Sequence, residues 1–103
     1  MAKLIVLFNL KPSADAAEYE AWAKSTDLPI VRDLPSVSRF DVHKVEGLFG
    51  NDAPAPYQYV EVIDVNDLEL FGQDVATDKM RNVAGQFREF ADNPVFMLSS
   101  DLV

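Results

Sequence analysis

The residues of this chain best suited to moving protons lie in two stretches of alternating polar and apolar character. His43 is the single histidine, and an imidazole both accepts and releases a proton near neutral pH. In residues 57–65, Tyr57, Tyr59 and Glu61 share one face of a strand, because successive side chains point to opposite faces. That face is too aromatic for water, yet it carries a carboxylate that a dry core would reject, as expected in a cleft.

A carboxylate that accepts a hydrogen bond from one imidazole nitrogen leaves the other nitrogen free to act as base and then as acid. We therefore predict that His43, Glu61 and Tyr59 are catalytic, in a proton shift, dehydration or tautomerisation of a planar molecule. The same pattern also fits a half-exposed strand histidine whose ring is satisfied by a neighbour, and both interpretations stay open.

Four further polar side chains are predicted to bind a substrate beside this face. Tyr57 and Asn9 could donate hydrogen bonds to a developing oxyanion. Arg39 could hold a carboxylate, and Asp41 is an alternative partner for the imidazole. Asn9 could instead bond to a turn at the end of its strand.

Asp27 is predicted to bind substrate because of where it lies. It follows a predicted helix, near the end where the helix dipole disfavours a negative charge. An unfavourable placement indicates a functional role. The alternative is an ion pair with Lys24 or Arg32.

Metal and cofactor sites are not predicted. One histidine and no cysteine leave only scattered carboxylates, without the spacing of a calcium loop. No glycine-rich phosphate loop or nucleophile elbow is present. The expected chemistry is therefore free of cofactors.

Composition indicates one globular domain over residues 1–103, with 49% hydrophobic and 25% charged residues. The formal net charge of -8 argues against nucleic acids and anionic membrane surfaces as partners. No apolar run approaches the roughly 20 residues of a membrane helix. The apolar run 4–8 ends at Asn9 without a cleavage site, so we expect a cytoplasmic protein.

The elements that must position these residues follow from hydrophobic periodicity and from the turn residues. We expect strands over 3–10, 37–45, 57–65 and 95–99, and helices over 15–25, 67–75 and 78–91. Pro29 and Pro35 are expected to keep the chain between the first helix and the second strand extended. Asn66 is expected to cap the short helix, and Trp22 to anchor the first helix in the core.

This order predicts an α+β, ferredoxin-like βαββαβ fold, with a four-stranded antiparallel sheet and helices on one face. Setting Phe40 and Val42 against Val60 and Val62 on the helix side places His43 opposite Tyr59 or Glu61. The other face would then expose apolar side chains. A second copy laid sheet to sheet would bury them, so we expect a homodimer that partly closes each cleft between sheet and helices.

The chain resembles the REDY-like HapK family, within the dimeric α/β-barrel superfamily of EthD-like and antibiotic-biosynthesis-monooxygenase-like proteins. The segments that carry the resemblance are 3–12, 19–22, 27–29, 32–37, 40–45, 55–57 and 92–96. EthD-type relatives often have His-x-Pro after the first helix, where this chain has Asp27-Leu28-Pro29.

The resemblance implies a dimeric α/β barrel that acts in secondary metabolism, on prodigiosin-type pyrrole or indole intermediates. It implies a cofactor-free dehydratase or lyase, isomerase or monooxygenase whose ligand is a planar aromatic or heteroaromatic molecule. The alternative is a non-catalytic ligand-binding or scaffold protein with the same fold.

Overall fold

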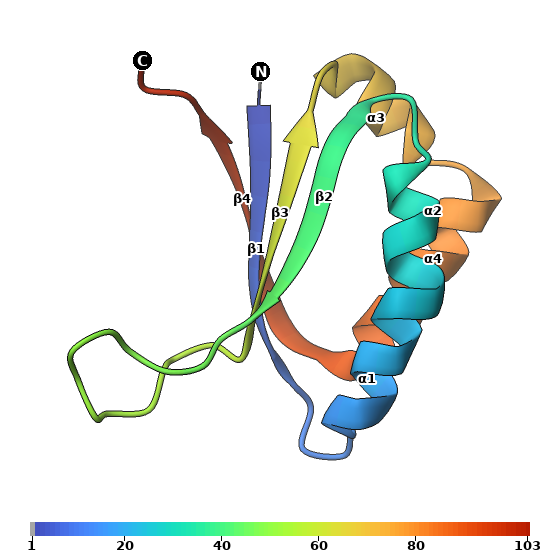
Figure 1. Ribbon diagram of the computed structural model, residues 1–103. Helices are drawn as coiled ribbons and strands as arrows, with labels where there is room; N and C mark the ends of the chain where they lie inside the picture. Colours follow the sequence, from blue (N-terminus) through green and yellow to red (C-terminus); the bar gives the residue numbers. More distant parts are fainter. Residues whose placement is uncertain (1) are drawn as a thin grey trace.

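The strands form one antiparallel sheet in the order β2-β3-β1-β4, and all helices cover the same face of it (Figure 1). The computed structural model describes residues 2–103. Its elements are β1 (Ala2–Leu10), α1 (Ala16–Trp22), the π-helical turn η1 (Ala23–Asp27), α2 (Leu28–Arg32), β2 (Val37–Lys44), β3 (Tyr59–Val65), α3 (Leu68–Asp74), α4 (Asp78–Phe90) and β4 (Ala91–Ser100). The predicted ferredoxin-like α+β fold is confirmed.

Side-chain caps start three of the helices. Asp15 accepts a hydrogen bond from the Ala17 N–H, and Thr77 accepts one from the Met80 N–H, as these residue types do at N-caps. The cap of α3 is Asp67, so the expectation of Asn66 is wrong. The Asn66 amide instead donates to the Pro35 carbonyl and the Ser38 hydroxyl, which ties the end of β3 to the start of β2.

The first helix does not give way to an extended segment, contrary to expectation. It widens into η1, where the Leu28 N–H donates to the Ala23 carbonyl five residues earlier, and continues as α2. Pro29 fits because it lies in the first turn of α2, whereas its ring would clash with the Ser25 carbonyl in an unbroken α-helix. The π turn therefore carries the helix past the proline.

The register between β2 and β3 differs from the predicted one. Phe40 pairs with Ile63, Val42 pairs with Glu61, and His43 pairs with Val60. The helix-covered face of β3 therefore holds Tyr59, Glu61, Ile63 and Val65, all of them buried. The prediction assumed that a carboxylate could not face the helices. In the structure the burial of three bulky side chains outweighs the cost of burying one carboxyl group.

Phe8 is the centre of the aromatic core. Its ring centroid lies 5.5 Å from Tyr19, 5.4 Å from Tyr59 and 4.9 Å from Phe87, and the side chain has no exposed surface. Trp22 packs at the edge of this cluster and donates a 2.6 Å hydrogen bond to Gln86, as expected of a core anchor. The cluster joins β1, β3, the first helix and α4.

The last strand begins at Ala91, directly after α4, and not at residue 95 as expected. The predicted stop signal around Asn93 lies inside the strand, where Asn93 takes a positive φ of 46°. Asparagine tolerates this left-handed conformation better than most residues do. Asn93 and Pro94 thus reach the edge of the sheet beside the end of α4. None of the helices in residues 2–103 combines the length and the apolarity needed to cross a membrane.

Phe8→Ala should lower the free energy of unfolding by about 3–5 kcal/mol, because it leaves a cavity among four elements. Urea denaturation followed by Trp22 fluorescence measures this. The matched control is Phe49→Ala, which truncates a fully exposed ring and should change the free energy by less than about 0.5 kcal/mol. Equal losses in the two variants would contradict this account of the core.

Candidate functional site

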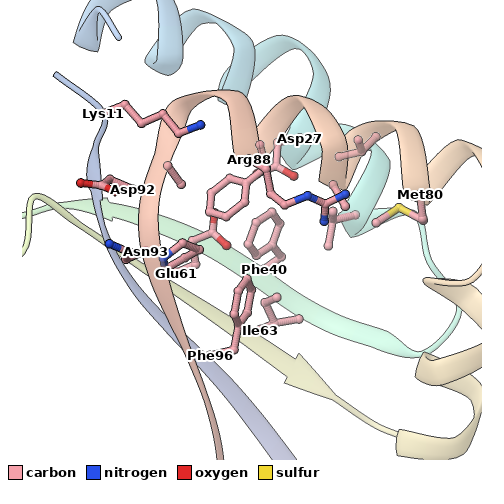
Figure 2. A pocket seen from close by; sticks show the side chains of 16 residues that line it. Lys11, Asp27, Phe40, Glu61, Ile63, Met80, Arg88, Asp92, Asn93 and Phe96 are labelled. Atoms are coloured by element: carbon pink, nitrogen blue, oxygen red, sulfur yellow. The ribbon is translucent and has the colours of Figure 1, made fainter. Parts of the chain in front are cut away.

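A cavity of about 440 Å³ lies between the helices and the sheet (Figure 2). Its volume is in the range of small-molecule sites. Ten of its sixteen lining residues are apolar, among them the aromatic rings of Phe40, Phe87 and Phe96. The polar lining consists of Lys11, Asp27, Glu61, Arg88, Asp92 and Asn93. A few polar groups in an apolar hollow are typical of a binding or active site.

Glu61 is the polar group on the floor of this cavity. It lies on β3 between Tyr59 and Ile63, and only 5% of its surface is exposed. Its Oε2 atom has no hydrogen-bond partner among residues 2–103. Burial, reinforced by the negative charge of Asp27, raises the pKa of Glu61 to about 8. This carboxyl group therefore gains or loses a proton near neutral pH.

Asp27 enters the cavity from the helix layer, at the end of η1. It is also 5% exposed, and burial raises its pKa to about 7. It forms neither of the ion pairs weighed from the sequence, since the four salt bridges of residues 2–103 include no Asp27. The prediction that Asp27 lies in the site fits this geometry, whereas the ion-pair alternative is wrong.

The π turn explains why Asp27 faces inward. The buried residues of this helix recur every four positions, at Tyr19, Ala23, Asp27 and Val31. In an α-helix of 3.6 residues per turn, such a row drifts by about 40° at each step. A wider turn takes up extra residues and cancels part of this drift, so that Asp27 and Val31 stay on the sheet side.

Tyr19 and Tyr59 belong to the aromatic core and line a separate, smaller cavity with Glu20 and Lys44. The Tyr19 hydroxyl is buried without a hydrogen-bond partner among residues 2–103, and its pKa is raised, first by burial and then by the charge of Glu61. The Tyr59 hydroxyl donates a 2.7 Å hydrogen bond to Glu20, which also lies 3.5 Å from the Lys44 ammonium. This bond holds the pKa of Glu20 below its usual value.

His43 does not join Glu61 and Tyr59. It lies on the opposite face of the sheet with Arg39, Asp41 and Lys3, around a cavity of about 200 Å³. The predicted contact between His43 and Glu61 is therefore wrong. His43 of β2 pairs with Val60 of β3, and Glu61, the next residue of β3, points to the opposite face. Asp41 is held by Arg39 at 2.6 Å and by Arg32 at 3.3 Å, which lowers the pKa of Asp41.

Asn9 and Tyr57 also lie away from the carboxyl pair. The Asn9 amide donates to the Pro56 carbonyl and accepts from the Gln58 N–H, so it holds the β2–β3 loop. This agrees with the alternative prediction, in which Asn9 bonds to a turn at the end of its strand. Tyr57 precedes β3 and lines a separate cavity of that loop. Neither residue is placed to contact a molecule held between Asp27 and Glu61.

Of the eight predicted site residues, the structure thus brings Asp27 and Glu61 together in one cavity, whereas the Tyr59 hydroxyl bonds to Glu20 in a separate one. Sequence reasoning missed the helix α4 wall, including Arg88, and the buried hydroxyl of Tyr19. One signal was available: Arg88 extends the apolar row of α4, formed by Met80, Val83, Ala84 and Phe87, with a charged residue. No group of three or more potential metal-ligating side chains gathers within residues 2–103.

Comparison with known proteins places this geometry in a family. Residues 2–102 match the family described as REDY-like protein HapK. A curated relative from Rhodococcus erythropolis, described as an uncharacterized 11.0 kDa protein in the thcB-thcC intergenic region, is 31% identical, with 98% of this chain and 94% of the relative covered.

Solved structures agree with this assignment. HapK from Hahella chejuensis is 33% identical with a TM-score of 0.79, covering 99% of this chain and 93% of that one. The fold is shared by an EthD-family protein from Bacillus halodurans, which is 20% identical with a TM-score of 0.78 over 99% of each chain. It is also shared by SnoaB, a cofactor-independent oxygenase from Streptomyces nogalater, which is 16% identical with a TM-score of 0.76, covering 97% of this chain and 91% of that one. The chain belongs to the REDY-like HapK family.

Proposed function

We propose that this protein is a cofactor-free acid–base enzyme that acts on a small planar molecule held between the sheet and the helices. The observation that carries this proposal is the pairing of two buried carboxyl groups, Asp27 and Glu61, in one mostly apolar cavity. An isolated carboxylate in such surroundings is costly, and perturbed pairs of this kind gather at active sites.

The protonation of the pair suits proton transfer. With pKa values of about 7 and about 8, Asp27 and Glu61 together hold roughly one proton at pH 7.5. The ionised member removes a proton from the substrate, and the protonated member returns one at a second atom. That sequence gives a tautomer with no net change in oxidation. If the second proton goes to a hydroxyl group, water leaves and a double bond forms.

The aromatic lining favours a flat ligand. Phe40, Phe87 and Phe96 offer ring faces and edges to a conjugated molecule. Family membership supports pyrrole or indole intermediates of secondary metabolism as the first compounds to test. SnoaB is named a cofactor-independent oxygenase, so for that neighbour the fold supports chemistry without a cofactor.

Glu61→Gln and Asp27→Asn should each lower turnover on the order of 10²–10⁴-fold, the usual contribution of a positioned acid or base. The wild-type chain is incubated in D₂O with a panel of pyrrole and indole aldehydes and carbinols. Mass spectrometry then detects deuterium uptake or loss of water. Unchanged turnover in both variants would contradict the assignment.

The control variant is His43→Gln, which changes a titratable side chain on the other face and should keep wild-type turnover. A panel member that binds tightly, as seen by thermal shift, and is recovered chemically unchanged in every case would favour the alternative of a non-catalytic binding protein.

The raised pKa values also predict how stability depends on pH. Between the unfolded pKa of Asp27, 3.8, and its folded pKa of about 7, the folded chain binds the proton more tightly than the unfolded chain. Raising the pH through this window therefore lowers the free energy of unfolding, by ~4 kcal/mol at 1.36 kcal/mol per unit. The raised pKa of Glu61 likewise lowers the free energy of unfolding as the pH rises from its unfolded pKa of 4.5 to its folded pKa of about 8.

Asp27→Asn should thus stabilise the fold at pH 9 and have little effect at pH 3.5, as measured by urea denaturation at both pH values. Asp52→Asn removes a carboxylate from an exposed loop and serves as the control. A stability difference between Asp27→Asn and wild type that stays the same at both pH values would show that Asp27 is not buried as a carboxylic acid.

We further propose a homodimer formed through the uncovered face of the sheet. There Val62, Ile5 and Met97 form one row across three strands, and Val60, Leu7 and Val95 form the next. Met97 is 41% exposed and Val95 38%. A structural neighbour from Thermobifida fusca is described as a dimeric ferredoxin-like protein. Burying this apolar patch against a second copy would stabilise both chains by about 25 cal/mol per Å².

Met97→Glu should therefore convert a dimer to monomers at micromolar concentration, because it places a charge within the apolar patch of the proposed interface. Sedimentation velocity measures the change. Leu68→Glu introduces the same charge on α3, at a 48% exposed position in the helix layer, and should remain dimeric. A wild-type chain that sediments as a monomer would contradict the proposal.

A further inference from the structure

Two unpaired cations line the cavity of a strongly acidic chain. The sequence has nine Lys and Arg residues against seventeen Asp and Glu residues. The salt bridges within residues 2–103 engage Lys3, Arg32, Arg39 and Lys44. Five cations take part in none of them: Lys11, Lys24, Lys79, Arg81 and Arg88. Of these five, Lys11 and Arg88 line the cavity, so they are placed to hold the anionic group of a ligand bound there.

Of these two cations, Arg88 is better placed to bind an anionic group of a ligand in the cavity. Figure 2 shows its side chain projecting from α4 on the same side as Asp27 and Phe40, while Lys11 enters near Asp92 and Asn93. Asp92 is exposed beside Lys11 and weakens the positive field there. The aliphatic stem of Arg88 continues the apolar row of α4, so it can cover the cavity wall and keep the guanidinium at the opening.

The helix dipole accounts for a cation at this place, but not for a guanidinium in particular. Arg88 is in the last turn of α4, where any cation interacts favourably with the helix dipole. That interaction needs only a positive charge near the helix end. A guanidinium, in contrast to an ammonium, presents a planar fork of N–H donors that matches both oxygens of a carboxylate.

The interior of the cavity is compatible with an anion at its mouth. In the proposed reaction one of the two inner carboxyl groups is ionised, so an anionic group of the ligand is better held at Arg88 than beside Asp27 and Glu61. An acidic group at Arg88 and a ring system against Phe40 and Phe87 would place both ends of the molecule in suitable surroundings.

We propose that Arg88 binds the carboxylate of the ligand and so orients a planar heteroaromatic acid with its ring toward Asp27 and Glu61. The proposal rests on the proposed function, because it assumes that the ligand occupies this cavity. It narrows the substrate class from planar heteroaromatic molecules in general to those that carry an acidic group.

Binding of matched acids and amides tests this assignment. The probes are indole-2-carboxylate and pyrrole-2-carboxylate, each compared with its carboxamide by isothermal titration calorimetry on the full chain at pH 7. The wild type should prefer the acid on the order of tenfold or more, as for hydrogen bonds to charged groups. Arg88→Gln should abolish the preference and leave amide binding unchanged, and Arg88→Lys should retain part of it.

The matched control is Arg81→Gln, on the same helix and outside the cavity, which should keep the full preference. Circular dichroism verifies that each variant is folded. An equal loss of acid binding in Arg81→Gln and Arg88→Gln would overturn the assignment, because general charge would then explain the effect. An acid preference that survives Arg88→Gln would also overturn it.

The two proposals fail in different ways. If acid and amide bind equally well to wild type, and Glu61→Gln still abolishes turnover of the panel, the Arg88 assignment is wrong and the proposed function stands. If indol-3-ylmethylamine binds in preference to both, the carboxyl pair acts as a receptor for cations and the Arg88 assignment is wrong. If no probe binds and no panel compound is converted, both proposals are wrong.

Discussion

The burial of Glu61 on the helix-covered face of β3 is the constraint on which the rest of the site depends. The two-residue repeat of a strand allows two placements, and in the observed one Tyr59, Ile63 and Val65 reach the core with it. The cost of desolvating the carboxyl group is lowered by retaining its proton, as its pKa of about 8 indicates. The cavity beside it lets a ligand, in place of the protein, satisfy the free Oε2 atom.

A second deviation from regular structure supplies the partner of that carboxyl group. Without the π turn, the row of residues at every fourth position would rotate away from the sheet after Ala23. The turn accommodates Pro29 and keeps Asp27 buried, so one local distortion meets a steric and a positional requirement together. π turns are rare in proteins overall, but those that occur are often found at functional sites. This is consistent with a role for Asp27 beyond stability.

Much of the fold followed from the sequence because local signals agree with one another. The apolar run of β1, the Asp15 and Thr77 caps and the apolar row of α4 all specify the observed elements. The register of β3 could not be predicted in this way. Both faces of that strand carry apolar residues, and the rule that core carboxylates are avoided selects the wrong one. That rule holds for ionised groups, whereas Glu61 escapes it by staying protonated. Asp27 was predicted from a helix end that the structure does not have there, because the helix continues through η1 into α2. Its burial depends on a π turn that leaves no residue pattern of its own.

Successive side chains of a β-strand point to opposite faces, so the proposed catalytic site and the proposed dimer interface lie on opposite faces of the sheet. On β3, Glu61 and Ile63 face the cavity, while Val60 and Val62 face the uncovered side. A dimer formed on the uncovered side therefore leaves the carboxyl pair in place, and it encloses His43 and its charged neighbours between the two sheets. In such a dimer, Arg39 and Asp41 would enter the interface already paired with each other in a salt bridge. Asp27 and Glu61 face the cavity, and these two carboxyl groups define the chemistry that a ligand bound there would meet.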